Sequence, residues 1–151
     1  MRVAVGSDHA GYELKAPVVD YLKSLGHTPL DVGTHSTDAV DYPDSARAVA
    51  EKLRAKQADL GIMICGSGVG GSIAVNKFPG VRGAVCHDMF SAHQGVEDDD
   101  MNVLCLGSRV IGRNLAMDIV KTFLGAKYSG LERHQRRLDK VNVIEKEFGK
   151  S

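Results

Sequence analysis

A cysteine that ends an apolar run and opens a glycine-rich turn is the most informative chemical feature of this chain. Residues 60–64 are apolar and predict a buried strand, and Cys65 follows as the first residue of Cys-Gly-Ser-Gly-Val-Gly-Gly. Glycines allow the backbone to approach a ligand closely, and a helix expected from about Ser72 would direct unpaired N–H groups into this turn. The partial positive charge of these N–H groups also favours a thiolate at Cys65, and a thiolate can act as a base or a nucleophile. The segment predicts chemistry on a small anionic substrate.

Polar residues also follow other apolar runs. Asp8 and His9 could bind a sugar hydroxyl, move a proton or hold a phosphate, although a helix cap is an equally good interpretation of Asp8. Arg109 could reach a phosphate or pair with a surface carboxylate. His35 and Tyr42 lie in a long polar loop, and an ordinary loop is the favoured interpretation for both.

A cluster of arginines lies near the end of the chain. Arg133 and Arg137 are four residues apart and share one face of a predicted helix, whereas Arg136 points elsewhere. Two guanidinium groups on one face match the geometry of a phosphate dianion. A solvated helix face is the ordinary alternative, but the glycine-rich turn independently predicts an anion.

Composition excludes several classes of protein. The 151 residues suit one domain, residues 1–151, and 19 Lys and Arg balance 19 Asp and Glu. No global field therefore attracts nucleic acid or a membrane surface. Three well-separated cysteines argue against a disulfide framework or a zinc site, and they suit a reducing cytoplasm. No signal segment or membrane span is evident. We expect neither a metal nor a cofactor.

Short apolar runs alternate with segments of helical periodicity. The strands are expected at residues 3–6, 28–32, 60–64, 83–85 and 103–106, and the helices at 12–25, 43–57, 72–77, 90–95 and 112–124. This alternation predicts a doubly wound, Rossmann-like α/β sandwich of three layers, with a five-stranded parallel sheet and the site at the carboxyl ends of the strands. A C-terminal helix over 131–147 has no strand after it, so we expect it to pack on a partner subunit.

Three kinds of chemistry can use such a glycine turn. Gly66, Gly68 and Gly71 spell G-x-G-x-x-G, and Asp88 lies at the distance of a ribose-binding carboxylate, so a nucleotide-binding module is a serious alternative. Two observations argue against the nucleotide-binding interpretation: the glycine motif follows the third strand, and the chain has no room for a second domain. A cysteine phosphatase would need an arginine where Gly71 stands. The remaining class is proton transfer beside a carbonyl, with Cys65 as the base.

The chain resembles type B ribose-5-phosphate isomerase, in a sugar-phosphate isomerase family that also includes allose-6-phosphate isomerase. The segments that carry the resemblance are 7–11, 41–43, 65–70, 76–82, 102–104, 107–109 and 133–137. They run in order over nearly the whole chain. The resemblance implies metal-free interconversion of an aldose phosphate and its ketose through a cis-enediol. It also implies a homodimer whose sites borrow residues from the neighbouring chain; whether dimers pair into tetramers stays open.

The resemblance also implies roles for individual residues. Cys65 would move the proton between carbons 1 and 2, and Ser67, where the family often has threonine, would position the reacting end. Gly66 and Gly70 would lend N–H groups to the enediolate.

The remaining implied roles concern substrate binding. Asp8 would contact sugar hydroxyls, and His9 the phosphate end. The phosphate would be held by Arg133 and Arg137, with Arg109 able to join them. His134 would assist proton transfer or simply bind the substrate.

One departure from the family pattern concerns the step that opens the sugar ring. Asp98 stands where the family has the histidine used for that step, within an acidic run at 97–100. A carboxylate at Asp98 could act as an acid–base group. Alternatively, Asp99 contacts the hydroxyls and the substrate needs no ring opening, or His93 takes the role.

We therefore expect an isomerase of ribose 5-phosphate and ribulose 5-phosphate. The alternatives are an isomerase of another sugar phosphate, such as allose 6-phosphate or a tetrose phosphate, and the nucleotide-binding module without catalysis.

Overall fold

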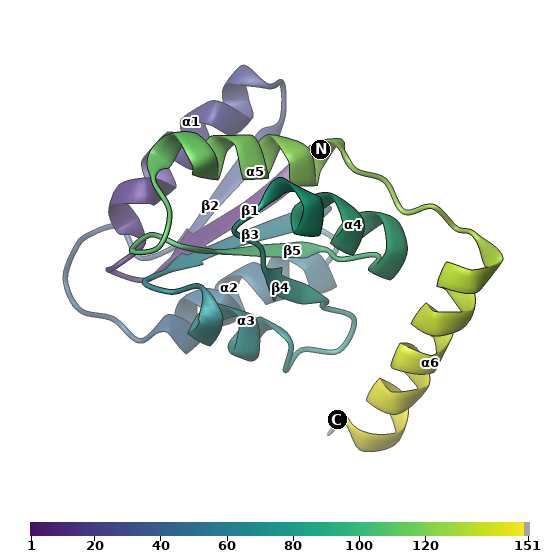
Figure 1. The fold of residues 1–151 in the computed structure, drawn as a ribbon. Coiled ribbons are helices and arrows are strands. Elements are labelled where there is room, and N and C mark those ends of the chain that lie inside the picture. Colours follow the sequence, from purple (N-terminus) through teal and green to yellow (C-terminus); the bar gives the residue numbers. More distant parts are fainter. Residues whose placement is uncertain (150–151) are drawn as a thin grey trace.

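The computed structural model describes residues 1–149 and contains one five-stranded parallel sheet (Figure 1). The strands are β1 (Arg2–Ser7), β2 (Thr28–Gly33), β3 (Leu60–Cys65), β4 (Gly83–Val85) and β5 (Val103–Gly107), in the order β2-β1-β3-β5-β4. The helices are α1 (Tyr12–Ser24), α2 (Tyr42–Arg54), α3 (Val69–Val75), α4 (Met89–Asp99), α5 (Arg113–Gly125) and α6 (Glu132–Phe148). The predicted fold class is confirmed.

Helices cover both faces of the sheet, as parallel strands require. One core lies between the sheet and α1, α4 and α5, and includes Leu22, Ile62 and Phe123. The other lies between the sheet and α2 and α3, and includes Val49 and Met63. Figure 1 shows these helices as two layers above and below the strands. Alternate residues of each strand enter opposite cores, which holds the strands in one register.

The register of the central strands brings their carboxyl ends together. β1 pairs with β3 so that Ser7 is opposite Ile64, and β3 pairs with β5 so that Cys65 is opposite Gly107. The chain leaves β1 toward β2 on one side and returns to β3 on the other. This change of direction opens a crevice at the carboxyl edge, where ligands bind in open α/β sheets.

Two helices differ from their predicted bounds in ways that matter for the site. α3 begins at Val69 rather than near Ser72, because Gly68 (φ 81°) turns the chain directly into the helix. α4 continues beyond Gly95 to Asp99 and ends at Asp100, whose φ is 53°. Most of the acidic run therefore lies in the last turn of a helix and not in a turn between elements. Within residues 1–149, no helix is long and apolar enough to cross a membrane.

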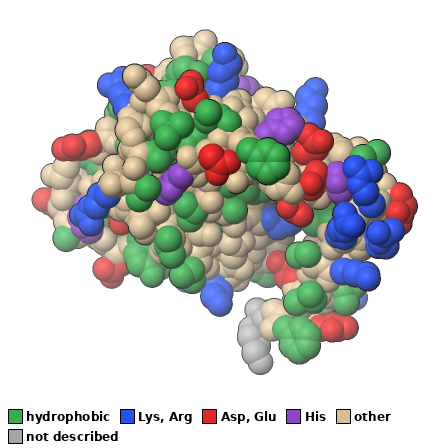
Figure 2. Space-filling model, in the orientation of Figure 1, with side chains coloured by type: hydrophobic (Ala, Val, Ile, Leu, Met, Phe, Trp, Pro, Cys, Tyr) green, Lys and Arg blue, Asp and Glu red, His purple; other side chains and the backbone are tan. Residues whose placement is uncertain are grey.

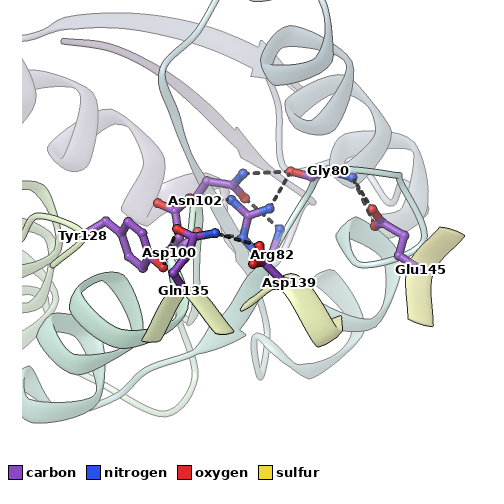
Figure 3. Close-up of polar contacts among 8 residues, drawn as sticks. All are labelled: Gly80, Arg82, Asp100, Asn102, Tyr128, Gln135, Asp139 and Glu145. Atoms are coloured by element: carbon purple, nitrogen blue, oxygen red, sulfur yellow. Dashed lines mark hydrogen bonds and ion pairs between the residues drawn. The ribbon is translucent and has the colours of Figure 1, made fainter. Parts of the chain in front are cut away.

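The C-terminal helix α6 extends away from the three-layered body (Figure 1). Its His134 and Leu138 are buried, whereas Val141, Ile144 and Phe148 are 51%, 59% and 74% exposed. At its far end the Glu145 carboxylate accepts hydrogen bonds from the Gly80 N–H at 3.1 and 3.2 Å, as Figure 3 shows.

Figure 3 also shows polar contacts within the first half of α6 and, separately, within the body beside it. Tyr128 donates to the Gln135 amide oxygen at 3.1 Å, and the Gln135 amide donates to Asp139 at 2.8 Å. On the body, Arg82 pairs with Asp100 at 3.0 Å. Because Arg82 immediately precedes β4, this ion pair puts the end of α4 at the amino edge of the sheet.

Candidate functional site

A pocket of about 320 Å³ lies at the carboxyl edge of the sheet and contains Cys65. It is lined by Asp8, Tyr42, Cys65, Gly66, Ser67, Gly70, Arg109 and Val110. Six of these eight residues are candidates that the sequence suggested, and they come from the ends of three strands. The structure therefore brings the cysteine, the glycine turn, one carboxylate and one arginine together.

The glycine turn is shaped around the sulfur of Cys65. The Gly68 N–H donates to Sγ at 3.2 Å, so the sulfur already acts as an acceptor in the turn. A Cβ added to Gly71 would lie 2.8 Å from Met63 Cγ and 3.5 Å from Sγ, so this position admits no side chain without displacement. Cys65 itself is 4% exposed and lines the pocket.

Ser67 and Gly70 complete the floor beside the sulfur. The Ser67 hydroxyl accepts from the Val69 N–H, at the first residue of α3, at 3.2 Å. Gly70 lies in the first turn of this helix, where backbone N–H groups have no carbonyl partner within the helix. A donor-rich floor next to a thiol can stabilise negative charge on a substrate oxygen.

Asp8 holds the turn after β1 and lies at the pocket. Its Oδ1 accepts from the Gly11 N–H at 3.0 Å, which organises the turn that leads into α1. It is 7% exposed and also lines the pocket. His9 does not line this pocket; its Nδ1 accepts from the Val40 N–H at 3.1 Å, in the loop before α2.

Arg109 provides the positive charge at this edge. Its backbone N–H donates to the Gly66 carbonyl at 3.0 Å. Its Nη1 lies 3.3 Å from the point that a Cβ on Gly66 would occupy, so the guanidinium extends over the glycine turn. Among residues 1–149 Arg109 makes no ion pair.

Tyr42 and Val110 also line the pocket; the sequence favoured an ordinary loop position for Tyr42 and did not single out Val110. The Tyr42 ring lies against Gly70, where an added Cβ would be 2.9 Å from two ring atoms. The signal in the sequence was the proline after Tyr42, which fixes the start of α2 at the carboxyl edge. Val110 carries no such signal, because its position follows from the turn after β5.

The other predicted residues lie at the opposite end of the molecule. They are Asp98 and Asp99 on α4, and Arg133, His134 and Arg137 on α6. α4 starts at the carboxyl edge and, at 1.5 Å per residue, runs about 16 Å back to the amino edge. Figure 1 accordingly shows α6 at the far end from the loop that follows β2. One copy of the chain does not bring these residues to Cys65.

This second group forms its own contacts. His134 Nε2 is 3.3 Å from the Asp98 carboxylate, and its Nδ1 is in hydrogen-bond contact with Ser129 Oγ. Asp99 and Arg137 line a separate pocket of about 250 Å³ together with Arg82. Figure 2 shows Lys and Arg side chains gathered over the first half of α6.

Two of the three neighbouring arginines on α6 keep unneutralised charge. Arg136 pairs with Glu132 at 2.9 Å, whereas Arg133 and Arg137 are exposed and make no ion pair in the part of the chain that the structure describes. This is the pair that the spacing predicted to share a face.

The remaining cysteines are poor nucleophiles. Burial, and then the negative charge of Asp88, raises the pKa of Cys86 to about 11. Burial raises the pKa of Cys105 as well, with smaller contributions from Cys65 and Cys86. Within residues 1–149 no three His, Cys, Asp or Glu side chains are grouped so that they could hold a metal ion.

The geometry does not favour the dinucleotide interpretation. β5 lies between β3 and β4, so Asp88 at the end of β4 is two strands away from the glycine turn. Its Oδ1 accepts from the Ser91 N–H at 2.6 Å, and this bond lowers the pKa of Asp88. The carboxylate is thus the cap of α4 rather than a group directed toward a ribose.

Comparison with known proteins identifies the family of the chain. The family model described as Ribose/Galactose Isomerase matches residues 3–141. The chain is 45% identical over 144 residues to ribose-5-phosphate isomerase B of Escherichia coli strain K12, covering 95% of this chain and 96% of that protein. It is 37% identical over 150 residues to galactose-6-phosphate isomerase subunit LacB of Clostridium acetobutylicum, covering 99% of this chain and 87% of that protein.

A solved structure shares the fold almost completely. The ribose-5-phosphate isomerase B of Clostridium thermocellum superposes with a TM-score of 0.95 at 47% identity, covering 98% of this chain and 99% of that one. The chain belongs to the ribose/galactose isomerase family and is a sugar-phosphate isomerase. The resemblance to type B ribose-5-phosphate isomerases is thereby confirmed.

Proposed function

We propose that the chain interconverts ribose 5-phosphate and ribulose 5-phosphate, with Cys65 as the base. The observation that carries this proposal is the sulfur of Cys65 in a donor-rich pocket at the switch point of the sheet, beside Asp8 and Arg109. Two relatives named as type B ribose-5-phosphate isomerases cover nearly the whole chain at 45% and 47% identity, which supports the choice of substrate.

The reaction moves one proton and one electron pair between two carbons. The thiolate of Cys65 removes the proton from C2 of the open-chain aldose, and the C–H electrons form the C1–C2 double bond as the C1 carbonyl becomes an enediolate oxygen. The backbone N–H groups of Gly66 and Gly70 stabilise that oxygen. The Cys65 thiol then returns the proton to C1, while the proton on O2 moves to O1 and leaves a ketone at C2. Ser67 and Asp8 hold the hydroxyls.

We propose that the active site is completed by a second copy of the chain. Arg133 and Arg137 are free to bind a phosphate, but they lie at the other end of the molecule from Cys65. The exposed apolar side chains of α6, including Ile144 and Phe148, give that helix a surface suited to a second copy. In a symmetric dimer each α6 reaches the other chain, so two identical sites form. Arg109 then binds the phosphate from within the pocket, and His9, which lies outside the pocket beside Val40, contributes at the phosphate end.

Another sugar phosphate is the second candidate substrate. The similarity to a galactose-6-phosphate isomerase subunit favours testing a six-carbon aldose phosphate beside ribose 5-phosphate. Allose 6-phosphate and a tetrose phosphate are compared in the same assay, because one proton transfer serves all of them.

The test is steady-state isomerisation of ribose 5-phosphate by the purified chain and by Cys65→Ala. Removal of a catalytic base typically costs about 10²–10⁴-fold in rate, so kcat should fall by at least about 10²-fold. Cys86→Ala is the matched control, because Cys86 is buried in the core beside β4 and should leave kcat unchanged. Calorimetric binding of ribitol 5-phosphate, which cannot react, should be similar in all three proteins. Full turnover by Cys65→Ala would refute the assignment of the base.

A further inference from the structure

We propose that His87 is a positioning residue for the Cys65 turn, by which we mean residues 65–68. Its imidazole holds the backbone of Gly107, at the end of β5, and Gly107 in turn holds the turn that carries the reactive sulfur. The inference rests on the proposed isomerase function and adds a residue to it. His87 is half-buried and does not line the Cys65 pocket, so it acts through Gly107 and not on the substrate.

The contact is a hydrogen bond from the backbone of β5 to a side chain of the next segment. The Gly107 N–H donates to His87 Nε2 at 2.9 Å. The neighbouring strand β4 ends at Val85, which is paired with Cys105, so Gly107 lies two residues beyond the last paired position. The imidazole supplies an acceptor where the strand has ended. A neutral imidazole that accepts at Nε2 carries its proton at Nδ1.

The backbone of Gly107 is packed directly against the Cys65 turn. A Cβ added to Gly107 would lie 2.6 Å from both the carbonyl carbon and the carbonyl oxygen of Ser67. A Cβ added to Gly68 would lie 3.2 Å from the nitrogen of Gly107. No side chain separates the two backbones, and well-packed interiors transmit small displacements. A shift of Gly107 therefore shifts the turn.

The two residues after Gly107 hold the same turn by hydrogen bonds. The Ser108 N–H donates to the Cys65 carbonyl at 2.9 Å, and the Arg109 N–H donates to the Gly66 carbonyl at 3.0 Å. The end of β5 thus contacts three consecutive residues of the turn. Fixing Gly107 fixes the start of this segment, and His87 is the side chain that does so.

These contacts lead to the sulfur in two steps. Gly68, which packs against the Gly107 nitrogen, donates its own N–H to Cys65 Sγ at 3.2 Å. The orientation of that N–H decides how well the turn stabilises a thiolate. The imidazole of His87 therefore influences both the place and the charge of the base, although the three residues are far apart in the sequence.

This role predicts an effect on kcat and not on substrate affinity. A catalytic group displaced by about 1 Å can cost on the order of 10²-fold in rate. The arginine pair on α6, which is proposed to hold the phosphate, takes no part in the contacts of His87. A displaced Cys65 turn should thus slow the proton transfer while KM stays nearly constant.

The experiment compares two amide side chains of different length at position 87. The amide oxygen of His87→Gln can reach the place of Nε2 and accept from Gly107, whereas that of His87→Asn is one carbon too short. His87→Asn should lower kcat for ribose 5-phosphate by about tenfold or more, and His87→Gln should stay within about twofold of the unmodified chain. KM should change by less than about threefold in both variants.

His27→Asn is the matched control, because it makes the same substitution at another half-buried histidine. His27 precedes β2 at the amino edge of the sheet, where its Nδ1 contacts the Met1 amino group at 3.1 Å. This variant should leave kcat unchanged. All rates are measured well below the Tm of each variant, so that a loss of stability does not lower the rate.

A second measurement follows the hydrogen bond itself and does not depend on activity. Amide hydrogen exchange at Gly107, resolved by NMR, should be equally slow in the unmodified chain and in His87→Gln. It should be at least about tenfold faster in His87→Asn, because the N–H has lost its acceptor.

The outcomes separate this inference from the proposed function. An unmodified chain that does not isomerise ribose 5-phosphate refutes the proposed function, and the role of His87 falls with it. If that chain is active, equal kcat values in His87→Gln and His87→Asn contradict the positioning role while the isomerase stands. A lower kcat in His87→Asn with unchanged exchange at Gly107 also contradicts it, because the effect would not pass through Gly107.

Discussion

The buried lysine Lys15 gives a prediction about stability that the structure makes quantitative. Lys15 is 2% exposed, and its ammonium donates to the Asp31 carboxylate at 2.6 Å and to the Thr34 carbonyl. The side chain of Asp31 is 42% exposed, so the two partners differ in their access to water. These contacts tie α1 to the end of β2 and to the loop whose Val40 holds His9.

Removing the two partners should have unequal effects. Asp31→Ala leaves the buried ammonium of Lys15 with only the Thr34 carbonyl as a partner. Breaking a buried ion pair lowers the free energy of unfolding by about 3–5 kcal/mol. Because the Thr34 contact remains, we expect a loss at the low end, about 3 kcal/mol. Lys15→Met leaves a carboxylate that water can solvate, and methionine fills the apolar space. The lost hydrogen bonds then dominate, at about 1–2 kcal/mol.

Urea unfolding at one fixed protein concentration measures the free energy of unfolding of each variant. The loss in the free energy of unfolding should be nearly the same for the double variant as for Lys15→Met. The double variant should therefore be more stable than Asp31→Ala alone. The reasoning is refuted if Lys15→Met is the more damaging single change, or if the two costs simply add.

Two further changes test individual contacts. Asp88→Ala should lower Tm, because the cap of α4 is lost, while leaving kcat for ribose 5-phosphate unchanged; a large loss of kcat with an unchanged Tm would contradict a purely capping role for Asp88. Burial raises the pKa of Cys86 from 9.0 to about 11, so its thiol stays neutral in the folded chain where the unfolded chain already ionises. Stability should therefore fall as pH rises above about 9, and urea unfolding should show a smaller fall in Cys86→Ala; an equal fall in both proteins would contradict this.

The alternation of apolar runs and helical segments was enough to predict the sheet and the contents of its carboxyl edge. Each strand delivers its next residues to the same edge, so Asp8, Cys65 and Arg109 had to lie along one edge of the sheet once the strands were parallel. Their grouping in one pocket follows from the adjacency of β1, β3 and β5, which the order of the strands along the chain does not determine.

The ends of the helices were harder to predict, and the reasons are local. Gly68 takes a left-handed conformation that starts α3 early, in a glycine-rich segment with low helix propensity. Gly95 lies inside α4 because Met101 packs over it, with Sδ 3.2 Å from the point where a Cβ would be. From the sequence alone, a glycine at this position predicts the end of a helix, because the residue that packs over it is not known. The true length of α4 decides where Asp98 lies.

The central claim is that Cys65 of one copy works with the arginine pair of another. It is tested most directly by co-expressing Cys65→Ala with Arg133→Ala/Arg137→Ala under two affinity tags and purifying the mixed dimer. Each parent should be nearly inactive on ribose 5-phosphate. The mixed dimer contains one complete site out of two and should recover about half of the unmodified activity. A mixed dimer no more active than its parents would contradict the shared site.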